Sequence, residues 1–201
     1  HHLAVQQIDD GKHAGHATGA AARQEGIFSV RGPGARRALL PAGRGAAVKA
    51  GPQIIGWDVG GAHLKACQLQ AGQVLDVAQW ACPLWQGLQH LDAAIAQARQ
   101  RWPALAEAQT RHAVTMTGEM VDLFANRAEG VQQIAAHLAA ALPGPVQLYA
   151  GEDPWCAVSE AAENWAHIAS ANWRATASHV AAWAQGRPGV LVDVGSTTTD
   201  L

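Results

Sequence analysis

The sequence contains few of the residues that would indicate a disulfide framework, a thiolate metal site or a membrane span. Its 201 residues include three cysteines, an odd number with no CxxC spacing, so neither paired disulfides nor a thiolate metal site is predicted. No run of about 18 or more apolar residues occurs, and the start lacks the apolar segment of a signal peptide. These absences argue against membrane insertion and favour a reducing, cytoplasmic setting.

Charged residues are also scarce, and they are unevenly distributed. Residues 1–51 contain seven Lys/Arg and three Asp/Glu, a net charge of +4, whereas the remainder contains seven and thirteen, a net charge of −6. Gly or Pro interrupts residues 1–51 at short intervals without an apolar period, which predicts a disordered, Gly-rich basic tail. Its basic cluster from Arg31 to Lys49 has no interleaved aromatic residues, so nucleic-acid binding is not expected. All eight tryptophans lie after residue 56, and the packed domain is predicted over 52–201.

The predicted elements of this domain alternate between strands and helices. Residues 53–58, 63–70 and 73–80 read as an antiparallel meander with turns at Gly60-Gly61 and Gly72. Apolar residues then recur at intervals of three and four, which is typical of helices with one buried face. Helices are predicted over 88–102, 131–142, 155–169 and 173–184, and further strands over 112–118, 146–150 and 190–194. Asn172 is expected to cap the last helix. The order predicts an α/β fold with helices over a mixed sheet.

Two short turns each follow an apolar strand that carries an aspartate. In IGWDVGGAHLKA, Asp58 ends a strand, and Gly60 and Gly61 follow where a side chain would block a ligand from the backbone N–H groups. The terminal VDVGSTTTDL repeats this plan, with Asp193 on the strand and a run of hydroxyl side chains after Gly195. Such a pair of turns would cradle a phosphate group from two sides.

The carboxylates of these turns would repel a phosphate unless a cation lay between them, so the pair implies Mg²⁺, held largely through water. Lys65 would neutralise a further charge. The simpler interpretation is that each Asp-x-Gly is only a tight turn, but two copies at strand ends favour the phosphate site. The predicted phosphate-binding residues are Gly60, Gly61, Lys65, Gly195, Ser196, Thr197, Thr198 and Thr199, and the predicted metal ligands are Asp58, Asp193 and Asp200.

Another carboxylate follows the strand predicted over 112–118. In TMTGE, Glu119 would orient a nucleophile or a metal-bound water, which makes it a catalytic candidate together with Asp58 and Asp193. The alternative is that Glu119 caps the turn that follows it. The stretch GEDPW offers Glu152 and Asp153 at the next strand end, with the same two interpretations.

Five motifs in this order resemble a known family. From about Ile54 to Leu201, DVGGAHLKA, PLWQGLQHL, MTGEMVDLFANRAEGV, ASANWRATA and DVGSTTTDL resemble the hydantoinase/oxoprolinase-like proteins of tetrahydromethanopterin-linked one-carbon transfer. These resemble in turn the superfamily of acetate and sugar kinases, heat-shock chaperones and actin. The family is also similar to an archaeal transferase of methanofuran biosynthesis that releases diphosphate. The resemblance implies a ribonuclease H-like first lobe of a two-lobed actin-like ATPase fold, with the ligand in the cleft.

The resemblance also implies a second lobe that would follow residue 201. The chain begins with His1 rather than Met, which agrees with a fragment or an artificial start. We therefore expect a C-terminally incomplete protein whose isolated activity is doubtful.

Three functions stay open at this stage. The first is an Mg²⁺-dependent transferase of one-carbon cofactor biosynthesis that releases diphosphate. The second is an ATP-dependent kinase, phosphatase or hydantoinase/oxoprolinase-type hydrolase, which the same pair of turns would serve. The third is a non-enzymatic nucleotide-binding regulator. All three predict a ligand that contains a diphosphate or a nucleotide, with Mg²⁺ and, in the second case, ATP; association into a homo-oligomer is left open.

Overall fold

The computed structural model describes residues 2–3, 53–151, 155–194 and 199–200. The chain divides into two units, one of Val48–Leu191 and one of His1–Ala47 with Val192–Leu201. The tail predicted over residues 1–51 lies outside the described residues except for 2–3, and so does the second predicted turn at 195–198.

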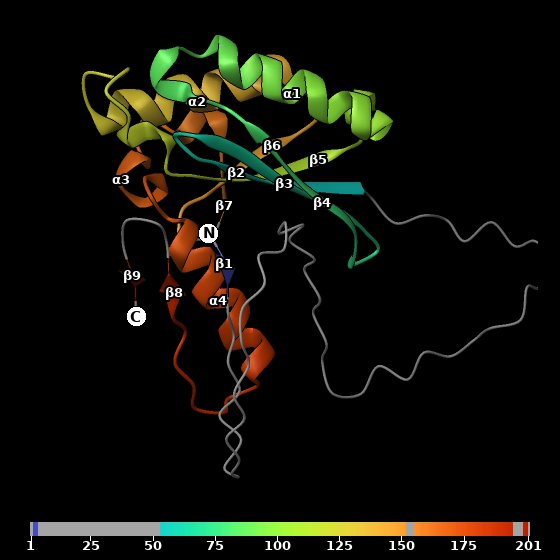
Figure 1. Cartoon of the computed structure of the whole chain (residues 1–201), viewed down its shortest axis with the longest axis vertical. Helices are drawn as coiled ribbons and strands as arrows, with labels where there is room; N and C mark the ends of the chain where they lie inside the picture. Colours follow the sequence, from blue (N-terminus) through green and yellow to red (C-terminus); the bar gives the residue numbers. More distant parts are fainter. Residues whose placement is uncertain (1, 4–52, 152–154, 195–198, 201) are drawn as a thin grey trace, which may run out of the picture. The chain divides into compact units, whose positions relative to one another are not determined.

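A six-stranded mixed sheet in the order β4-β3-β2-β5-β6-β7 forms the larger unit (Figure 1). Its first three strands form the predicted antiparallel meander: β2 (Gln53–Val59), β3 (His63–Gln70) and β4 (Gln73–Ala81). The two later strands predicted for this sheet are also present, close to their predicted bounds.

Those two strands run parallel to β2. β5 (Arg111–Met116) pairs with β2, and β6 (Val146–Tyr149) pairs with β5. A short strand, β7 (Trp155–Ala157), closes this edge by pairing antiparallel with β6. The mixed α/β fold is thereby confirmed; its finer assignment to an actin-like lobe stays a prediction.

One face of the sheet is closed by two amphipathic helices, α1 (Gln89–Arg101) and α2 (Arg127–Ala141), which lie together over it in Figure 1. Their buried positions follow the three-and-four spacing of the sequence: Leu91, Ala94, Ile95, Ala98, Val131, Ile134, Ala135 and Leu138. On β2, Ile55, Trp57 and Val59 alternate into the same core. The residues between them therefore point to the opposite face.

Within the described residues, the opposite face is only partly covered. α4 (Asn172–Ala184) contacts β5, and Ser178 on this helix lies 3.3 Å from the hydroxyl of Tyr149 on β6. No residue of α4 is buried. We call this side of the sheet the open face; its β2, β3 and β4 portion carries the half-buried and exposed side chains considered below.

The helix predicted over 155–169 is wrong. This segment contains β7, a 3₁₀ turn at Val158–Glu160 and a four-residue helix, α3 (Trp165–Ile168). Its apolar spacing suits a helix, but Cys156 is buried where β7 pairs with β6, and the left-handed backbone of Ser170, with φ of 54°, follows α3. Tertiary pairing outweighed local periodicity here.

Two predictions for the end of the chain also need correction. Ala171, not Asn172, is the cap residue of α4, because the helix already includes Asn172. The Oδ1 of Asn172 accepts the N–H of its neighbour Trp173 at 2.8 Å. The strand expected over 190–194 is only β8 (Asp193–Val194). It pairs with β1 (His2–Leu3) and β9 (Thr199–Asp200) in a three-stranded sheet, not with the six-stranded one.

Three further 3₁₀ turns connect the elements: Leu84–Gln86, Pro103–Ala106 and Gly118–Met120. Within the described ranges, no helix combines the length and apolar character needed to cross a bilayer.

Asp76 on the edge strand β4 forms hydrogen bonds with residues at the end of α1. The carboxylate of Asp76 accepts Arg101 Nε at 2.8 Å and Nη2 at 3.1 Å, and it accepts Trp102 Nε1 at 2.8 Å. The hydrogen bond from Arg101, and then that from Trp102, lowers the pKa of Asp76 to about 2. The ionised carboxylate is thus favoured by folding.

Replacing Asp76 by Ala is expected to lower the free energy of unfolding at pH 7 by about 1–2 kcal/mol, because two charged or polar donors lose their acceptor. Since the folded pKa lies below the unfolded one, this stabilisation is present above pH 4 and is lost as the pH falls toward about 2. Urea unfolding measures the difference. The exposed Glu163→Ala is the control, and an equal loss in both variants would contradict the role of the Asp76 contacts.

A buried histidine joins β2 to β5 inside the closed face. His112 is 1% exposed, its Nδ1 accepts Trp57 Nε1 at 3.2 Å, and its Nε2 lies 3.0 Å from the carbonyl oxygen of Pro143. Because an indole N–H can only donate, the proton of the neutral imidazole is on Nε2 and is donated to Pro143. Burial lowers the pKa of His112, although the bond to Pro143 acts in the opposite direction.

A lowered folded pKa means that the contribution of His112 is complete above the ordinary histidine pKa and is lost as the pH falls below it. We therefore expect Tm to fall between pH 7 and pH 5, and to fall less steeply in His112→Asn, whose amide oxygen can still accept from Trp57. Differential scanning calorimetry at several pH values measures both slopes. The exposed His167→Asn should retain the wild-type slope; a wild-type slope in His112→Asn would contradict the assignment.

Candidate functional site

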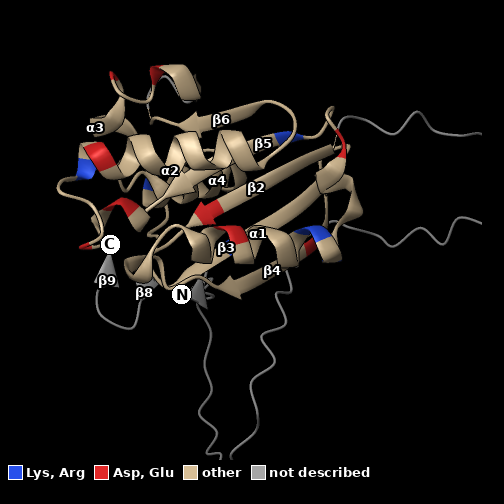
Figure 2. Ribbon diagram, turned by 90° about the horizontal axis from the view of Figure 1, so that it is seen from above, with Lys and Arg blue, Asp and Glu red and all other residues tan. Residues whose placement is uncertain are grey.

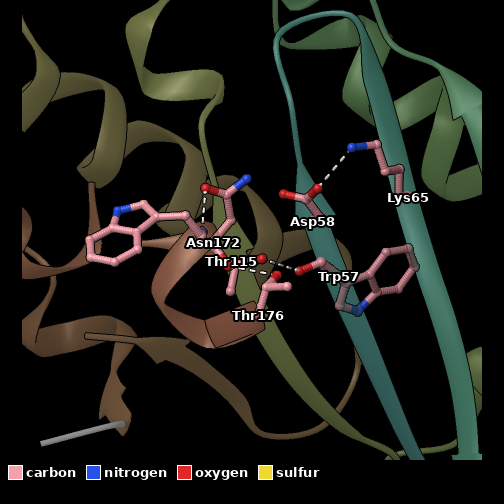
Figure 3. A network of polar contacts seen from close by, with 7 residues as sticks. Trp57, Asp58, Lys65, Thr115, Asn172 and Thr176 are labelled. Carbon is pink, nitrogen blue, oxygen red and sulfur yellow. Dashed lines mark hydrogen bonds and ion pairs between the residues drawn. The ribbon is translucent and has the colours of Figure 1, made fainter. Parts of the chain in front are cut away.

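Three polar residues lie side by side on the open face of the sheet. In the register of the strands, Asp58 on β2 stands opposite Lys65 on β3 and beside Thr115 on β5. Lys65 Nζ donates to Asp58 Oδ2 at 3.1 Å, and the two side chains are 30% and 25% exposed. Figure 3 shows this ion pair with Thr115 and with Asn172 of α4. We call Lys65, Asp58 and Thr115 the polar row.

The carboxylate of Asp58 is only half satisfied. Its Oδ1 atom is buried and has no hydrogen-bond partner among the residues that the structure describes, whereas Oδ2 accepts from Lys65. A buried acceptor without a donor costs about 1–3 kcal/mol, so such an atom calls for a water, a ligand group or a cation. This oxygen is the strongest local indication of a binding site.

The remaining polar groups of this site differ in what they can offer. The hydroxyl of Thr115 donates to the carbonyl oxygen of Trp57 at 3.2 Å, so its oxygen is left as an acceptor. Asn172 uses Oδ1 to accept from the backbone of Trp173, so its side-chain amide nitrogen is left as the donor. Lys65 is the cation of the row, which therefore offers both positive charge and acceptor oxygens.

A cavity of about 330 Å³ lies over this part of the sheet. Its lining combines the polar row with uncharged residues and one tryptophan: Gly56, Trp57, Asp58, Lys65, Ala66, Cys67, Val77, Ala113, Val114, Thr115 and Trp155. The cavity is an open depression in the surface, and the lining that it exposes is apolar. Charged side chains are rare on this sheet; β2 to β7 contain only Asp58, Lys65, Asp76 and Arg111, and Figure 2 shows the strands mostly tan.

The glycines of the first predicted turn have a packing role. A Cβ on Gly61 would lie 2.8 Å from Cγ1 of Val121, and a Cβ on Gly118 would lie 2.7 Å from Cδ2 of Leu84. The N–H of Gly60 donates to the carbonyl oxygen of His63 at 3.0 Å, inside the hairpin. The turn is thus packed tightly against the loop after β5, and this arrangement explains Gly61 without a ligand. The phosphate-binding role predicted for Gly60 and Gly61 stays a prediction.

The buried side chain of Glu119 connects three segments of the chain through polar contacts. Its side chain is 0% exposed, and Oε1 accepts Arg127 Nη2 at 2.9 Å and Ser170 Oγ at 2.7 Å. It thereby joins the loop after β5 to the start of α2 and to the turn before α4. Its Oε2 is buried and has no partner in the described part of the chain. These contacts support a positioning role, while its predicted catalytic role is not tested by them.

The second predicted turn is described only at its flanks. Asp193 pairs with Asp200, and Val194 with Thr199, in the antiparallel strands β8 and β9. Gly195, Ser196, Thr197 and Thr198 lie outside the described residues, as do Glu152 and Asp153. The expectation that the two turns face each other across one ligand therefore stays a prediction.

Sequence reasoning missed three residues of the site. Thr115 was read only as part of a strand, Gly56 was not singled out, and Trp155 was assigned to a helix. A signal for Gly56 was present, because an isolated glycine inside a strand marks a bulge or a close approach to the backbone. No signal in the sequence places Thr115 next to Asp58, because that contact depends on the parallel pairing of strands far apart in the chain.

The described residues provide no ready-made metal cage. In the ranges that the structure covers, no group of three or more His, Cys, Asp or Glu residues converges on one point. Mg²⁺ is usually bound by one or two carboxylates and several waters, so a site built on Asp58 alone among the described carboxylates is still compatible with this ion.

Comparison with known proteins supports the resemblance. The hydantoinase/oxoprolinase family model matches residues 110–201. The chain is also 28% identical over 148 residues to (4-{4-[2-(gamma-L-glutamylamino)ethyl]phenoxymethyl}furan-2-yl)methanamine synthase of Methanocaldococcus jannaschii. That match covers 74% of this chain and 42% of the relative, so the chain spans about two fifths of the length of the relative. The predicted similarity to this family and to this enzyme is confirmed.

Glu119→Gln is expected to lower the free energy of unfolding by about 1–3 kcal/mol, because it removes the charge that holds Arg127 and buries an amide donor in place of Oε2. Urea unfolding measures this loss. Glu163→Gln, at an exposed position, is the matched control and should change stability by less than half as much. A Glu119→Gln protein as stable as wild type would contradict the stabilising role of the Glu119 contacts.

Proposed function

We propose that this chain carries the diphosphate-binding part of an Mg²⁺-dependent transferase of one-carbon cofactor biosynthesis, one that releases diphosphate. The observation that carries the proposal is the polar row, in which the cation of Lys65 adjoins the Asp58 carboxylate with its buried, unpartnered Oδ1. The similarity to a synthase of known product supports the reaction class.

Lys65 would bind the anionic group of the substrate. Its ammonium has three donors, one of which is used by Asp58, so the others can point to phosphate oxygens. Charge grows on the diphosphate as the bond to it breaks, and a donor fixed in the sheet then interacts more strongly than with the intact substrate. Asp58 holds the ammonium in place by its ion pair, and no covalent protein nucleophile is required.

The residues present fit Mg²⁺ as a partner of this anion. Asp58 Oδ1 is an orphaned acceptor, and Thr115 Oγ1 is left as an acceptor by its bond to Trp57. Oxygen atoms of this kind are the ligands, direct or through water, that Mg²⁺ prefers. Asp193 and Asp200 are the further carboxylates predicted for it. When bound, Mg²⁺ would offset the negative charge of the diphosphate.

A second candidate is an ATP-dependent hydrolase. The match to the hydantoinase/oxoprolinase family over residues 110–201 favours it, and Lys65 would serve a nucleotide phosphate equally well. The two candidates differ in the need for a base-binding segment. Diphosphate binding without ATP or ADP binding would favour the transferase.

The test is calorimetry with diphosphate, with and without Mg²⁺, on wild type and on Asp58→Asn. We expect Asp58→Asn to weaken binding at least about tenfold in the presence of Mg²⁺, because the cation loses its carboxylate. Without Mg²⁺ the same change should leave binding unchanged or strengthen it, because one negative charge near the anion is removed. Lys65→Gln should weaken binding under both conditions.

The control is Glu163→Gln, which neutralises an exposed carboxylate outside the open face. Circular dichroism should confirm that all variants are folded. If Asp58→Asn binds diphosphate with Mg²⁺ as tightly as wild type, or if wild type binds none, the proposed site is wrong.

A further inference from the structure

The two edges of the six-stranded sheet differ in length and in protection. β7 has three residues, whereas β4 has nine, and no further strand of the described sheet lies beyond either of them. Edge strands of soluble proteins are usually blunted by short length, lysine, proline or a bulge. β4 contains neither lysine nor proline, and its single charged residue, Asp76, is engaged by Arg101 of α1. Apart from a bulge near its start, β4 is therefore an edge that is open to pairing.

The bulge leaves a regular segment of β4 after it. The register with β3 shifts at Leu75, which is the extra residue. Over residues 76–81 the pairing with β3 is uninterrupted. Val77 is 51% exposed, and Gln79 and Ala81 are exposed as well. Residues 76–81 thus form a regular strand edge with accessible side chains.

The hydrogen bonds of β4 show which of its backbone groups face away from β3. In an antiparallel pair, every second residue directs both its N–H and its C=O to the partner strand. The N–H of Cys82 donates to the carbonyl oxygen of Ala62 at 2.8 Å, so residues an even number of positions before Cys82 face β3. The residues between them direct their backbone groups outward, and these are Val77, Gln79 and Ala81.

One of these outward groups already has a partner. The N–H of Val77 donates to Oδ1 of its neighbour Asp76 at 2.9 Å, which agrees with an outward direction. Among the described contacts, the outward groups left over are the C=O of Val77 and the N–H and C=O of both Gln79 and Ala81. Donors and acceptors therefore recur every second residue, at a spacing of about 7 Å. An antiparallel strand presents the matching pattern.

We propose that β4 pairs with β4 of a second copy of this chain, antiparallel about a twofold axis at Gln79. In this register Gln79 stands opposite Gln79 of the second copy, and Val77 stands opposite Ala81 of the second copy. The N–H of each Gln79 donates to the carbonyl oxygen of the other, and the N–H of each Ala81 donates to the carbonyl oxygen of Val77. The bond from Val77 to Asp76 is kept. The two sheets thereby join edge to edge, and this pairing does not rest on the proposed function.

The side chains of this register are complementary in size. On the open face, Val77 lies opposite the small Ala81 of the second copy. On the closed face, Trp80 lies opposite the small Ala78 of the second copy. The ring of Trp80 stands edge-on to that of Trp102, with centroids 5.4 Å apart and planes at 84°, so its position is fixed within its own copy. Large side chains facing small ones across the axis allow close cross-strand packing.

The charges near β4 are compatible with this pairing. Asp76 lies three residues from the axis at Gln79, so the two Asp76 carboxylates would be about 20 Å apart, beyond the screening length of about 10 Å, and each is paired with Arg101. Lys65 stands opposite Gln79 on β3. The two Lys65 residues would be three strand spacings apart, about 14 Å, and each is paired with Asp58. No like charges meet, which favours a second copy as the occupant of this edge.

The experiment measures dimerisation by sedimentation equilibrium over a range of protein concentrations, without ligand. The variants are Gln79→Lys and Gln79→Glu, each of which places like charges directly across the proposed axis. The matched controls are Gln73→Lys and Gln73→Glu, because Gln73 is an exposed glutamine of the same strand on the other side of the bulge. Circular dichroism should confirm that all variants are folded.

We expect wild type to dimerise reversibly with a dissociation constant on the order of 0.1 mM, since one strand pair is a small interface. Each Gln79 variant alone should raise this constant at least about fivefold, because like charges meet at the axis. A mixture of Gln79→Lys with Gln79→Glu should recover dimers, since opposite charges then meet there. The Gln73 variants should behave as wild type. Amide exchange at Gln79 and Ala81 should slow as wild-type concentration rises.

Three results would overturn the pairing. The first is a wild-type protein that stays monomeric up to about 1 mM. The second is a dimer that neither Gln79 variant weakens, because another surface would then hold it together. The third is a dimer that both variants weaken but their mixture does not recover. Calorimetry with diphosphate is independent of these results: a dimeric protein that binds no diphosphate would refute the proposed function and leave the pairing intact.

Discussion

The register of β2 between β3 and β5 is the constraint on which the site depends. Asp58 has Lys65 on one side and Thr115 on the other only because β2 pairs antiparallel with one neighbour and parallel with the other. A slip of one residue would turn Asp58 into the closed core and bring Trp57 to the open face. The buried residues Ile55, Trp57 and Val59, with the bond from Trp57 to His112, oppose that slip. The hydrophobic face thus positions the polar one.

Glycines around this strand serve two distinct purposes. Gly61 and Gly118 allow the hairpin after β2 and the loop after β5 to approach closely, and a Cβ at either would force atoms to within 2.8 Å. They fix where the strand ends, next to Asp58. Gly56 meets no such crowding, and the space it leaves is on the surface of the cavity. Glycine therefore permits close packing at Gly61 and Gly118, whereas at Gly56 it leaves space on the surface of the sheet.

Local patterns in the sequence predicted most of the larger unit. The meander follows from alternating residues and its glycine turns, and α1 and α2 follow from apolar spacing, because each depends on contacts close in the chain. The segment 155–169 could not be predicted in this way, since Trp155 and Cys156 are placed by pairing with β6, a long-range contact. For the site, Asp58 and Lys65 were predicted from one short segment, as the aspartate before the glycine pair and the lysine after it, and the hairpin places them opposite each other. The position of Thr115 beside Asp58 depends on the parallel pairing of β2 with β5, which no local pattern reveals.

The charges of the polar row also constrain how it could bind an anion. Lys65 and Asp58 largely cancel each other, so the row presents little net positive charge to a diphosphate, which carries several negative charges. Anion binding there must gain its electrostatic stabilisation from an additional cation or from donors elsewhere in the chain. The orphaned Oδ1 of Asp58 has the complementary deficit, since it is an acceptor without a donor. A cation between the carboxylate and the anion would contact Asp58 Oδ1 and would also offset the negative charge of the anion. The binding of metal and the binding of anion at this row should therefore be linked, each strengthening the other.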